Sequence, residues 1–245
     1  MLQTLITRCT INELDVRFSV LRLSHVNAQP TKTRIPTQPR AQQTRQSLLA
    51  AAEREFAKHG YALTTAKTVA ARAHTATGSF YQYFESKDHV LREIARARQS
   101  ETIERTLRAL DELPALDGDA NAVLEDIRAR MRTIVDLTMA YHADLRGLQT
   151  VLAERRLVDG ELDALLRSGE SRLVDRVAEL LRAWGHDVDV EATAFVLFAA
   201  VRGAVQAHVT GHARVSDARF IAAAVDALVR VALPMSFLRP PTTLS

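Results

Sequence analysis

From residue 44 onward, apolar side chains recur three and four positions apart, and neither an alternating strand pattern nor an internal repeat is evident. Residues 45–59 illustrate this spacing, with one stripe formed by Leu48, Leu49, Ala52 and Phe56. The chain holds only 9 Gly and 7 Pro in 245 residues, and both residue types weaken helix interiors. The sequence therefore predicts an all-α fold of about nine helices.

Residues suited to helix ends set the predicted boundaries. Gly60 lies where the first helix should end, and Thr64 is placed to cap the second helix. Ser86 is placed to cap the fourth helix, with Asp88 favourable in its first turn. The predicted helices span residues 45–59, 65–73, 77–83, 87–110, 120–141, 145–153, 160–184, 190–210 and 217–233.

Basic residues concentrate in one stretch of the chain. Residues 30–91 carry nine Lys/Arg against four Asp/Glu, whereas residues 92–245 carry 20 against 23, within a net charge of +3. This imbalance favours a polyanion-binding module near one end, although an ordinary solvated face would give the same balance. The prolines and basic residues between positions 30 and 43 indicate a linker, so we expect residues 1–40 to form a flexible basic N-terminal extension.

The chain shows none of the signals of export. Its single cysteine, Cys9, excludes an intrachain disulfide, and Glu13 and Asp15 interrupt the apolar stretch that a signal peptide would need. The most apolar run, residues 192–201, ends at Arg202 and is shorter than the roughly 20 residues that cross a bilayer. We therefore expect a soluble, cytoplasmic protein without a membrane segment.

Residues 44–91 are the most informative part of the chain. Two short predicted helices, braced by a first one, form the arrangement of a helix-turn-helix. Phe80 and Phe84 lie four positions apart in the third helix and should face the core. The opposite face carries the small, hydroxyl and amide groups of Gly78, Ser79, Tyr81 and Gln82. Such groups suit base edges and phosphates in a major groove, although an aromatic helical face can also be plain core.

This stretch resembles the N-terminal DNA-binding domain of the TetR (tetracycline repressor) family of transcriptional regulators. The matching residues are FAKHGY (56–61), TT (64–65), VA (69–70), TGSFYQYF (77–84) and SK (86–87). The resemblance implies a helix-turn-helix domain over residues 41–88 and an effector-binding and dimerisation domain over residues 89–245. The chain departs from the family at His74, where Gly is usual in the turn, and at Ala76, where a Ser cap is usual.

The resemblance also implies which residues contact DNA. Bases would be read by Thr77, Gly78, Ser79 and Gln82. Phosphates would be contacted by Tyr81, Tyr83 and Lys87, the last of them beside the positive end of the fourth helix. The second helix would be held against the DNA backbone by Thr64, Thr65 and Lys67, and a phosphate or minor-groove contact would come from Arg45.

Beyond residue 91 the resemblance lies in the helix pattern alone. It implies a small-molecule pocket among the central helices, for which the candidates are Met131, Val135, Thr138, Tyr141, Trp184, Phe198 and Arg202. Each of these residues would serve equally well as plain core. Arg202 and Gln206 lie four positions apart in an apolar helix, where they would pair across a dimer or anchor a polar group of a ligand.

The last two predicted helices are apolar on almost every face, and such helices are expected to be buried on every face. We expect a homodimer through these helices, with a central core helix of a monomer as the alternative. His208 and His212 have the spacing of a helical metal pair, but no third ligand is evident. Neither a metal nor another cofactor is therefore predicted.

Together these features predict a sequence-specific DNA-binding regulator, a repressor that a small-molecule effector releases from a palindromic operator. Two alternatives stay open: a DNA-binding architectural or regulatory protein without an effector, and a helical enzyme. The sequence shows no nucleophile motif, no Gly-rich phosphate loop and no paired carboxylate cluster, so an enzyme is not expected.

Overall fold

The computed structural model describes residues 39–143, 146–211 and 214–238, all of which belong to one compact unit spanning residues 33–245. These residues contain ten helices and no strand, which confirms the all-α prediction. The helices are α1 (Pro39–Leu63), α2 (Ala66–Arg72), α3 (Thr77–Tyr83), α4 (Lys87–Asp111), α5 (Ala120–Ala143), α6 (Arg146–Arg155), α7 (Gly160–Ala183), α8 (Val190–Val209), α9 (Asp217–Ala232) and α10 (Met235–Leu238). The predicted extension up to residue 38, with Cys9, lies outside the described residues.

Helix α1 is longer than predicted. It begins at Pro39 rather than at residue 45, because proline fits the first turn of a helix, where its fixed φ is suitable and its missing N–H costs nothing. Residues 39–43, predicted as part of a linker, are therefore helical. The helix breaks at Gly60, whose φ of 72° and ψ of 178° are not helical, and this break confirms the predicted end of the first helix.

Helix α2 is capped by Thr65, not by Thr64 as predicted. The Thr65 hydroxyl accepts a hydrogen bond from the Thr68 amide (3.2 Å), and the Thr65 amide donates to the Thr68 hydroxyl (3.0 Å). Thr64 is fully buried and donates its hydroxyl to the carbonyl oxygen of Gly60 (2.7 Å). The prediction was one residue early because both threonines satisfy the sequence preference for an N-cap.

The turn into α3 is built without a glycine and without a capping hydroxyl. His74 has a φ of 55°, the only positive φ among non-glycine residues in the described parts of the chain. Helix α3 follows Ala76, which has no side-chain acceptor to offer, and no side-chain cap is found at this helix start. By contrast, Ser86 accepts from the His89 amide (3.1 Å) and confirms the predicted cap of α4.

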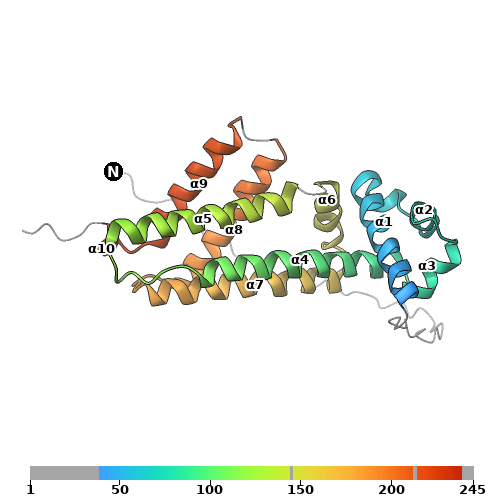
Figure 1. The fold of residues 1–245 in the computed structure, drawn as a ribbon, viewed down its shortest axis with the longest axis horizontal. Coiled ribbons are helices and arrows are strands. Elements are labelled where there is room, and N and C mark those ends of the chain that lie inside the picture. The colour runs from blue at the N-terminus through green and yellow to red at the C-terminus, as the bar shows by residue number, and fades with distance from the viewer. Residues whose placement is uncertain (1–38, 144–145, 212–213, 239–245) are drawn as a thin grey trace, which may run out of the picture. The chain divides into compact units, whose positions relative to one another are not determined.

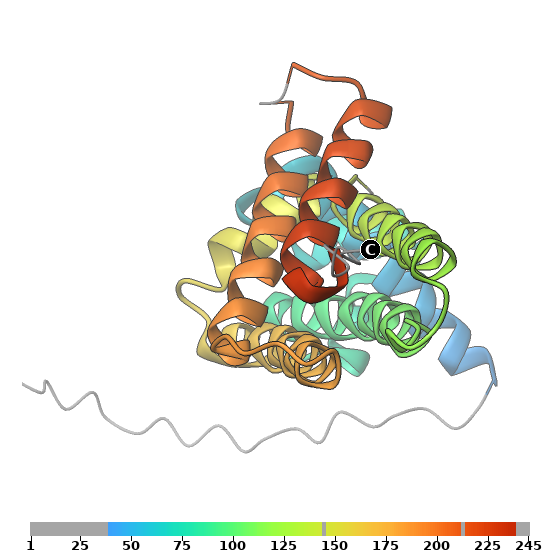
Figure 2. The ribbon, with the colours of Figure 1, turned by 90° about the vertical axis from the view of Figure 1, so that its left-hand side faces the viewer.

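Two hydrophobic clusters hold these helices together. The N-terminal core joins α1–α4 to α6 and the beginning of α7, and its largest fully buried side chains are Phe56, Phe80, Phe84, Leu48, Leu91, Leu148 and Leu162. The distal core joins the end of α4 to α5, α7, α8 and α9. Helix α4 contributes to both cores and runs beside α7, while α6 lies against α1 (Figure 1). Helices α8 and α9 lie side by side in both views (Figure 1 and Figure 2).

Replacing Ala76 with Ser should stabilise the protein by about 1 kcal/mol, since a hydroxyl at this position would accept from an amide in the first turn of α3. Urea unfolding followed by circular dichroism measures the change. Ala71→Ser is the control, because Ala71 is exposed inside α2 and Ser there should cost about 0.5 kcal/mol of helix propensity. Equal unfolding free energies for the two variants would contradict an uncapped α3.

Candidate nucleic-acid interface and ligand cavity

Helix α3 has one anchored face and one open face. Phe80 and Phe84 are 1% and 0% exposed, and their ring centroids lie 5.5 Å apart in the N-terminal core. On the other face, the exposed residues are Thr77, Gly78, Tyr81 and Gln82, while Ser79 and Tyr83 are half-buried. A short helix with its aromatic side buried and its polar side open has the geometry of a major-groove reading helix.

The other predicted DNA contacts differ in their exposure and in whether their side chains are already bonded within the chain. Thr65 and Lys67 are exposed at the beginning of α2. Thr64 cannot reach a phosphate with its side chain, because it is 0% exposed and its hydroxyl is bonded within the chain; this part of the prediction is wrong. The Arg45 guanidinium pairs with Glu93 and lies 5.4 Å from the centroid of the Phe84 ring, so it links α1 to α4.

Lys87 is also held within the protein. Its ammonium donates to the carbonyl oxygens of Tyr61 (2.8 Å) and Thr64 (3.1 Å) and lies 3.9 Å from the centroid of the Tyr61 ring. Burial lowers the pKa of Lys87. A phosphate bound by Lys87 would have to share the ammonium with these two carbonyl groups, which tie the start of α4 to the end of α1.

Tyr61 stands at a charged junction between α1, α4 and α6. Its hydroxyl donates to Asp88 Oδ1 (2.5 Å), and the guanidinium carbon of Arg155 lies 4.0 Å from its ring centroid. Arg155 also pairs with Asp88 (3.0 Å). Burial and the bond to Asp88 raise the pKa of Tyr61 to about 12, so the phenol remains a hydrogen-bond donor at neutral pH.

A second link joins α4 to the start of α7. Arg92 Nε donates to both carboxylate oxygens of Asp159 (2.9 and 3.2 Å), and its Nη1 pairs with Glu161 (2.6 Å). Asp159 also caps α7 by accepting from the Leu162 amide (3.1 Å). Burial acts to raise the pKa of Asp159, but the bonds from Arg92 and Leu162 outweigh it and hold the pKa below its usual value. The buried carboxylate therefore stays ionised and bound.

A cavity of about 390 Å³ lies among α4, α5, α6, α7 and α8 and is closed partly by α9. Six of the seven candidate pocket residues line it: Met131, Thr138, Tyr141, Trp184, Phe198 and Arg202. The seventh, Val135, is fully buried in the distal core and does not line the cavity.

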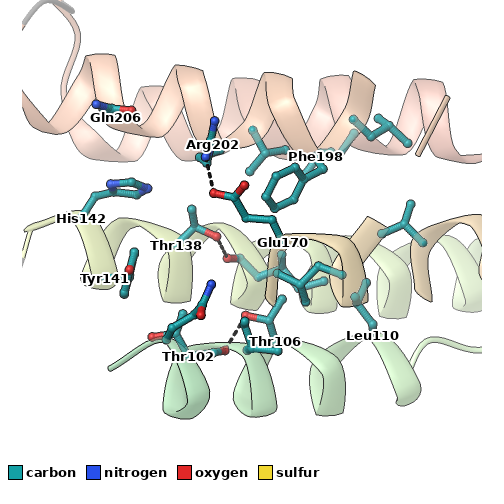
Figure 3. Close-up of a pocket in the computed structure, with 18 of the residues that line it drawn as sticks. Thr102, Thr106, Leu110, Thr138, Tyr141, His142, Glu170, Phe198, Arg202 and Gln206 are labelled. Atoms are coloured by element: carbon teal, nitrogen blue, oxygen red, sulfur yellow. Dashed lines mark hydrogen bonds and ion pairs between the residues drawn. The ribbon is translucent and has the colours of Figure 1, made fainter. Parts of the chain in front are cut away.

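Polar side chains gather at one end of the cavity (Figure 3). Arg202 Nη1 donates to Glu170 Oε1 (2.6 Å), and Arg156 Nη1 donates to the same oxygen (3.1 Å). This polar end is completed by Tyr141, His142, Gln149 and Gln206. Burial and the charge of Arg202 lower the pKa of His142, so its ring is neutral at pH 7, while burial raises the pKa of Tyr141.

Sequence reasoning missed Arg156, Glu170 and His142 as lining residues. A signal for Glu170 was present, since it lies on the same stripe of α7 as Leu166, Leu173 and Val177, all of which line the cavity. A carboxylate inside an otherwise apolar helical stripe must have a partner or line a polar space. No comparable pattern marks Arg156, whose place depends on how α6 and α7 pack.

Helix α6 connects the cavity to the N-terminal helices. Gln149, Leu152 and Ala153 line the cavity, whereas Leu148 and Val151 are buried in the N-terminal core. At Gly147 a Cβ atom would overlap the carbonyl group of Ala57 in α1, so no side chain fits between the two helices.

Helix α8 leaves a wide apolar face uncovered. Phe195 and Val196 are 62% and 59% exposed, and the exposed small residues Ala200, Gly203, Ala204 and Ala207 continue the face. By length and composition alone this helix would also suit a membrane span, but a helix that packs on another protein surface passes the same test. On the adjoining helix α9, Ala222, Ala223, Ala227 and Val231 are exposed.

His208 is used inside the fold. Its Nε2 lies 2.8 Å from Asp217 Oδ1, and its ring stacks on Phe220 with centroids 4.2 Å apart. His212, its partner in the predicted spacing, lies outside the described residues. Among the described residues, no group of three or more His, Cys, Asp or Glu side chains is placed to hold a metal ion.

These features define a class of fold: a helix-turn-helix arrangement over α1–α4, followed by a helical part that encloses a cavity. Residues 48–94 match the family model for bacterial regulatory proteins of the tetR family. No curated protein sequence matches the chain. The part of the chain from α1 to the beginning of α4 is therefore similar to the DNA-binding part of bacterial regulatory proteins of the tetR family.

Several solved structures share the fold. A TetR-like transcriptional regulator from Rhodococcus sp. RHA1 is 22% identical, with 77% of this chain and 93% of that chain covered and a TM-score of 0.57. A putative TetR-family regulator from Mesorhizobium loti MAFF303099 is 18% identical, with coverages of 80% and 97% and a TM-score of 0.64. SmeT, the repressor of the Stenotrophomonas maltophilia multidrug efflux pump SmeDEF, is 22% identical in its triclosan complex, with coverages of 82% and 97% and a TM-score of 0.61.

Gly147→Ala should destabilise the protein by about 1–3 kcal/mol, because the added methyl group would force α6 away from the backbone of α1. Thermal and urea unfolding measure the loss. The matched control is Gly160→Ala at the exposed first position of α7, where a Cβ atom meets nothing within 4 Å and Ala should be neutral or slightly stabilising. A Gly147→Ala variant as stable as the control would show that the α1–α6 contact is looser than described.

Proposed function

We propose that this chain is a cytoplasmic, homodimeric repressor that leaves a palindromic operator when a small molecule enters its cavity. The open face of α3 is the observation that carries the DNA-binding part, since Thr77, Gly78, Tyr81 and Gln82 are exposed there opposite two buried phenylalanine rings. This face has amide, hydroxyl and backbone groups but no charge of its own, which suits base edges more than bulk electrostatic attraction.

Within this face the roles differ by chemistry. Gln82 has an amide that both donates and accepts, as recognition of adenine requires. Gly78 has no Cβ atom and lets the helix backbone approach the groove. The hydroxyl of Tyr81, which is 61% exposed, and the exposed Thr65 and Lys67 of α2 are the phosphate contacts of this proposal.

The apolar face of α8 supports the homodimer. Only 28% of the most apolar part of this helix is buried within the chain, and the uncovered face consists of Phe195, Val196 and a series of small residues. Large apolar patches on soluble proteins mark association surfaces, and small residues allow two helices to approach closely. A second copy of the same face, related by a two-fold axis, would cover it and would present two copies of α3 to the two halves of a palindrome.

Ligand entry would be coupled to DNA binding through α4 and α6. Both helices line the cavity, α4 through Gln99 and Ile103 and α6 through Gln149 and Leu152. Both also pack in the N-terminal core, and the ion pair of Arg155 with Asp88 links them directly. A ligand that repacks the cavity would shift these helices and, with them, the separation of the two reading helices, at a coupling energy of about 1–3 kcal/mol.

Gln82→Ala should weaken specific DNA binding by about 1–3 kcal/mol and relax base choice, because an amide that pairs with a base edge is lost. Fluorescence anisotropy measures the affinity for a duplex that the wild-type protein selects from a random pool. Gln46→Ala, an exposed glutamine on α1, is the control and should leave base choice unchanged. Wild-type affinity and base choice in Gln82→Ala would remove Gln82 as a reader, and unchanged affinity in Thr77→Ala and Tyr81→Phe as well would contradict the proposed interface.

Phe195→Glu should convert the dimer to a monomer, because two carboxylates would be buried in the apolar face of α8. Light scattering should give about twice the 27.2 kDa chain mass for the wild type and the chain mass for the variant. Leu157→Glu is the control: Leu157 is 84% exposed in the turn after α6, away from the proposed interface, and should leave the dimer intact. A wild-type protein of the chain mass would contradict the homodimer.

A further inference from the structure

The charges that line the cavity do not balance. Among the described lining residues, three are charged at pH 7: Arg156, Glu170 and Arg202. His142 adds no charge, because burial and the neighbouring Arg202 lower its pKa. The polar end of the cavity therefore has two guanidinium groups for one carboxylate, which leaves one positive charge in excess.

Of the two guanidinium groups, that of Arg202 has the fewer acidic partners. Arg156 has a second acidic partner, Asp163 (3.1 Å), in addition to Glu170. In the described part of the chain, the one ion pair of Arg202 is with Glu170, and its side chain is 43% exposed. Because a guanidinium has five N–H donors, this single bond leaves Arg202 with capacity for a further acceptor.

The remainder of the cavity is mostly apolar, and its other polar lining residues are Gln99, Thr102, Thr106 and Thr138. Away from the polar end, the lining includes Leu110, Leu113, Met131, Ile134, Leu180 and Trp184. The indole N–H of Trp184 donates to the carbonyl oxygen of Pro114 (3.1 Å), so a ligand would meet only the apolar surface of this ring. Figure 3 shows Arg202 between Phe198 and the polar side chains of His142 and Gln206. A ligand that matches this lining has one polar head and one apolar body.

We propose that the ligand of this cavity is an amphipathic monoanion, a carboxylate on an apolar body, whose head is bound by Arg202. The proposal rests on the proposed function, in which the cavity is the effector site, and it names the chemical class of the effector. A carboxylate forms paired, charge-assisted hydrogen bonds with a guanidinium and neutralises the excess charge. A cationic head would instead compete with two guanidinium groups for Glu170, and an alcohol would leave the excess charge uncompensated.

Three unbranched ligands with ten carbon atoms each test the head group: decanoate, 1-decanol and decylammonium. Calorimetry on the wild-type protein without DNA should show decanoate binding at least about tenfold more tightly than decanol, with decylammonium weaker than either. Shortening the body to octanoate should weaken binding about fourfold for each CH₂ removed. Decanol within twofold of decanoate, a preference for decylammonium, or no decanoate binding at millimolar concentration would each overturn the proposal.

Two substitutions at the polar end should have opposite effects. Arg202→Gln should weaken decanoate binding about tenfold or more and leave decanol binding nearly unchanged. Glu170→Gln should strengthen decanoate binding several-fold, because it removes the carboxylate that competes with decanoate for Arg202. If the cavity instead bound a cation, the same substitution would remove the binding site. Arg167→Gln is the matched control: this arginine of α7 is 68% exposed, pairs with Asp163 and does not line the cavity, so it should bind decanoate as the wild type does. Weaker decanoate binding in Glu170→Gln would overturn the proposal even if Arg202→Gln did not fold.

Anisotropy with the selected duplex separates this proposal from the proposed function. Release of the duplex by decanoate but not by decanol supports both. Tight, head-group-selective decanoate binding that leaves DNA affinity unchanged supports the ligand class and contradicts the effector role of the cavity. Release by decanoate and decanol at equal concentrations supports the effector role and overturns the ligand class.

Discussion

The rest of the structure depends on the direct packing of α6 against the backbone of α1 at Gly147. Because no side chain separates the two helices there, Leu148 and Val151 of α6 enter the same core as the phenylalanines that anchor α3. Protein interiors are close-packed, so a shift of α6 cannot be absorbed by empty space and must be passed to α1. Helix α3 and the cavity wall are therefore parts of one packed unit.

The charged groups between helices fix the relative orientation of the helices more than they add to the free energy of unfolding. Tyr61, Lys87, Asp88 and Arg155 meet where α1, α4 and α6 approach, and Arg92 with Asp159 fixes α4 to the start of α7. Partly buried ion pairs contribute little net free energy, because desolvation offsets attraction, but a displaced partner leaves an uncompensated charge. Such pairs favour a small number of discrete arrangements over continuous deformation, which is what a switch between two states needs.

Features encoded within one helical turn were predictable from the sequence, and contacts between distant residues were not. The bounds of α3, the cap at Ser86 and the anchoring of Phe80 and Phe84 follow from spacing and capping chemistry. Six of the seven pocket candidates, which the family resemblance implied, line the cavity from α5, α8 and the C-terminal end of α7.

The contacts that were not predicted from the sequence share a physical reason. The intrachain partners of Lys87 and Arg45, and the pairing of Glu170 with Arg202, join residues 23 to 48 positions apart, and no local pattern specifies them. Thr64 was misplaced because two adjacent threonines offer the same hydroxyl, and only the break at Gly60 decides which of them faces inward.

In the proposed homodimer, the uncovered face of α8 would link the folded state to the concentration of the chain. With a second copy covering Phe195 and Val196, part of the free energy that keeps α8 and α9 folded would come from association rather than from contacts within one chain. Each tenfold dilution would then make the dimer less stable, relative to separate chains, by about 1.4 kcal/mol. In the proposed homodimer, chain abundance would itself control how much of the protein is folded, paired and able to occupy DNA.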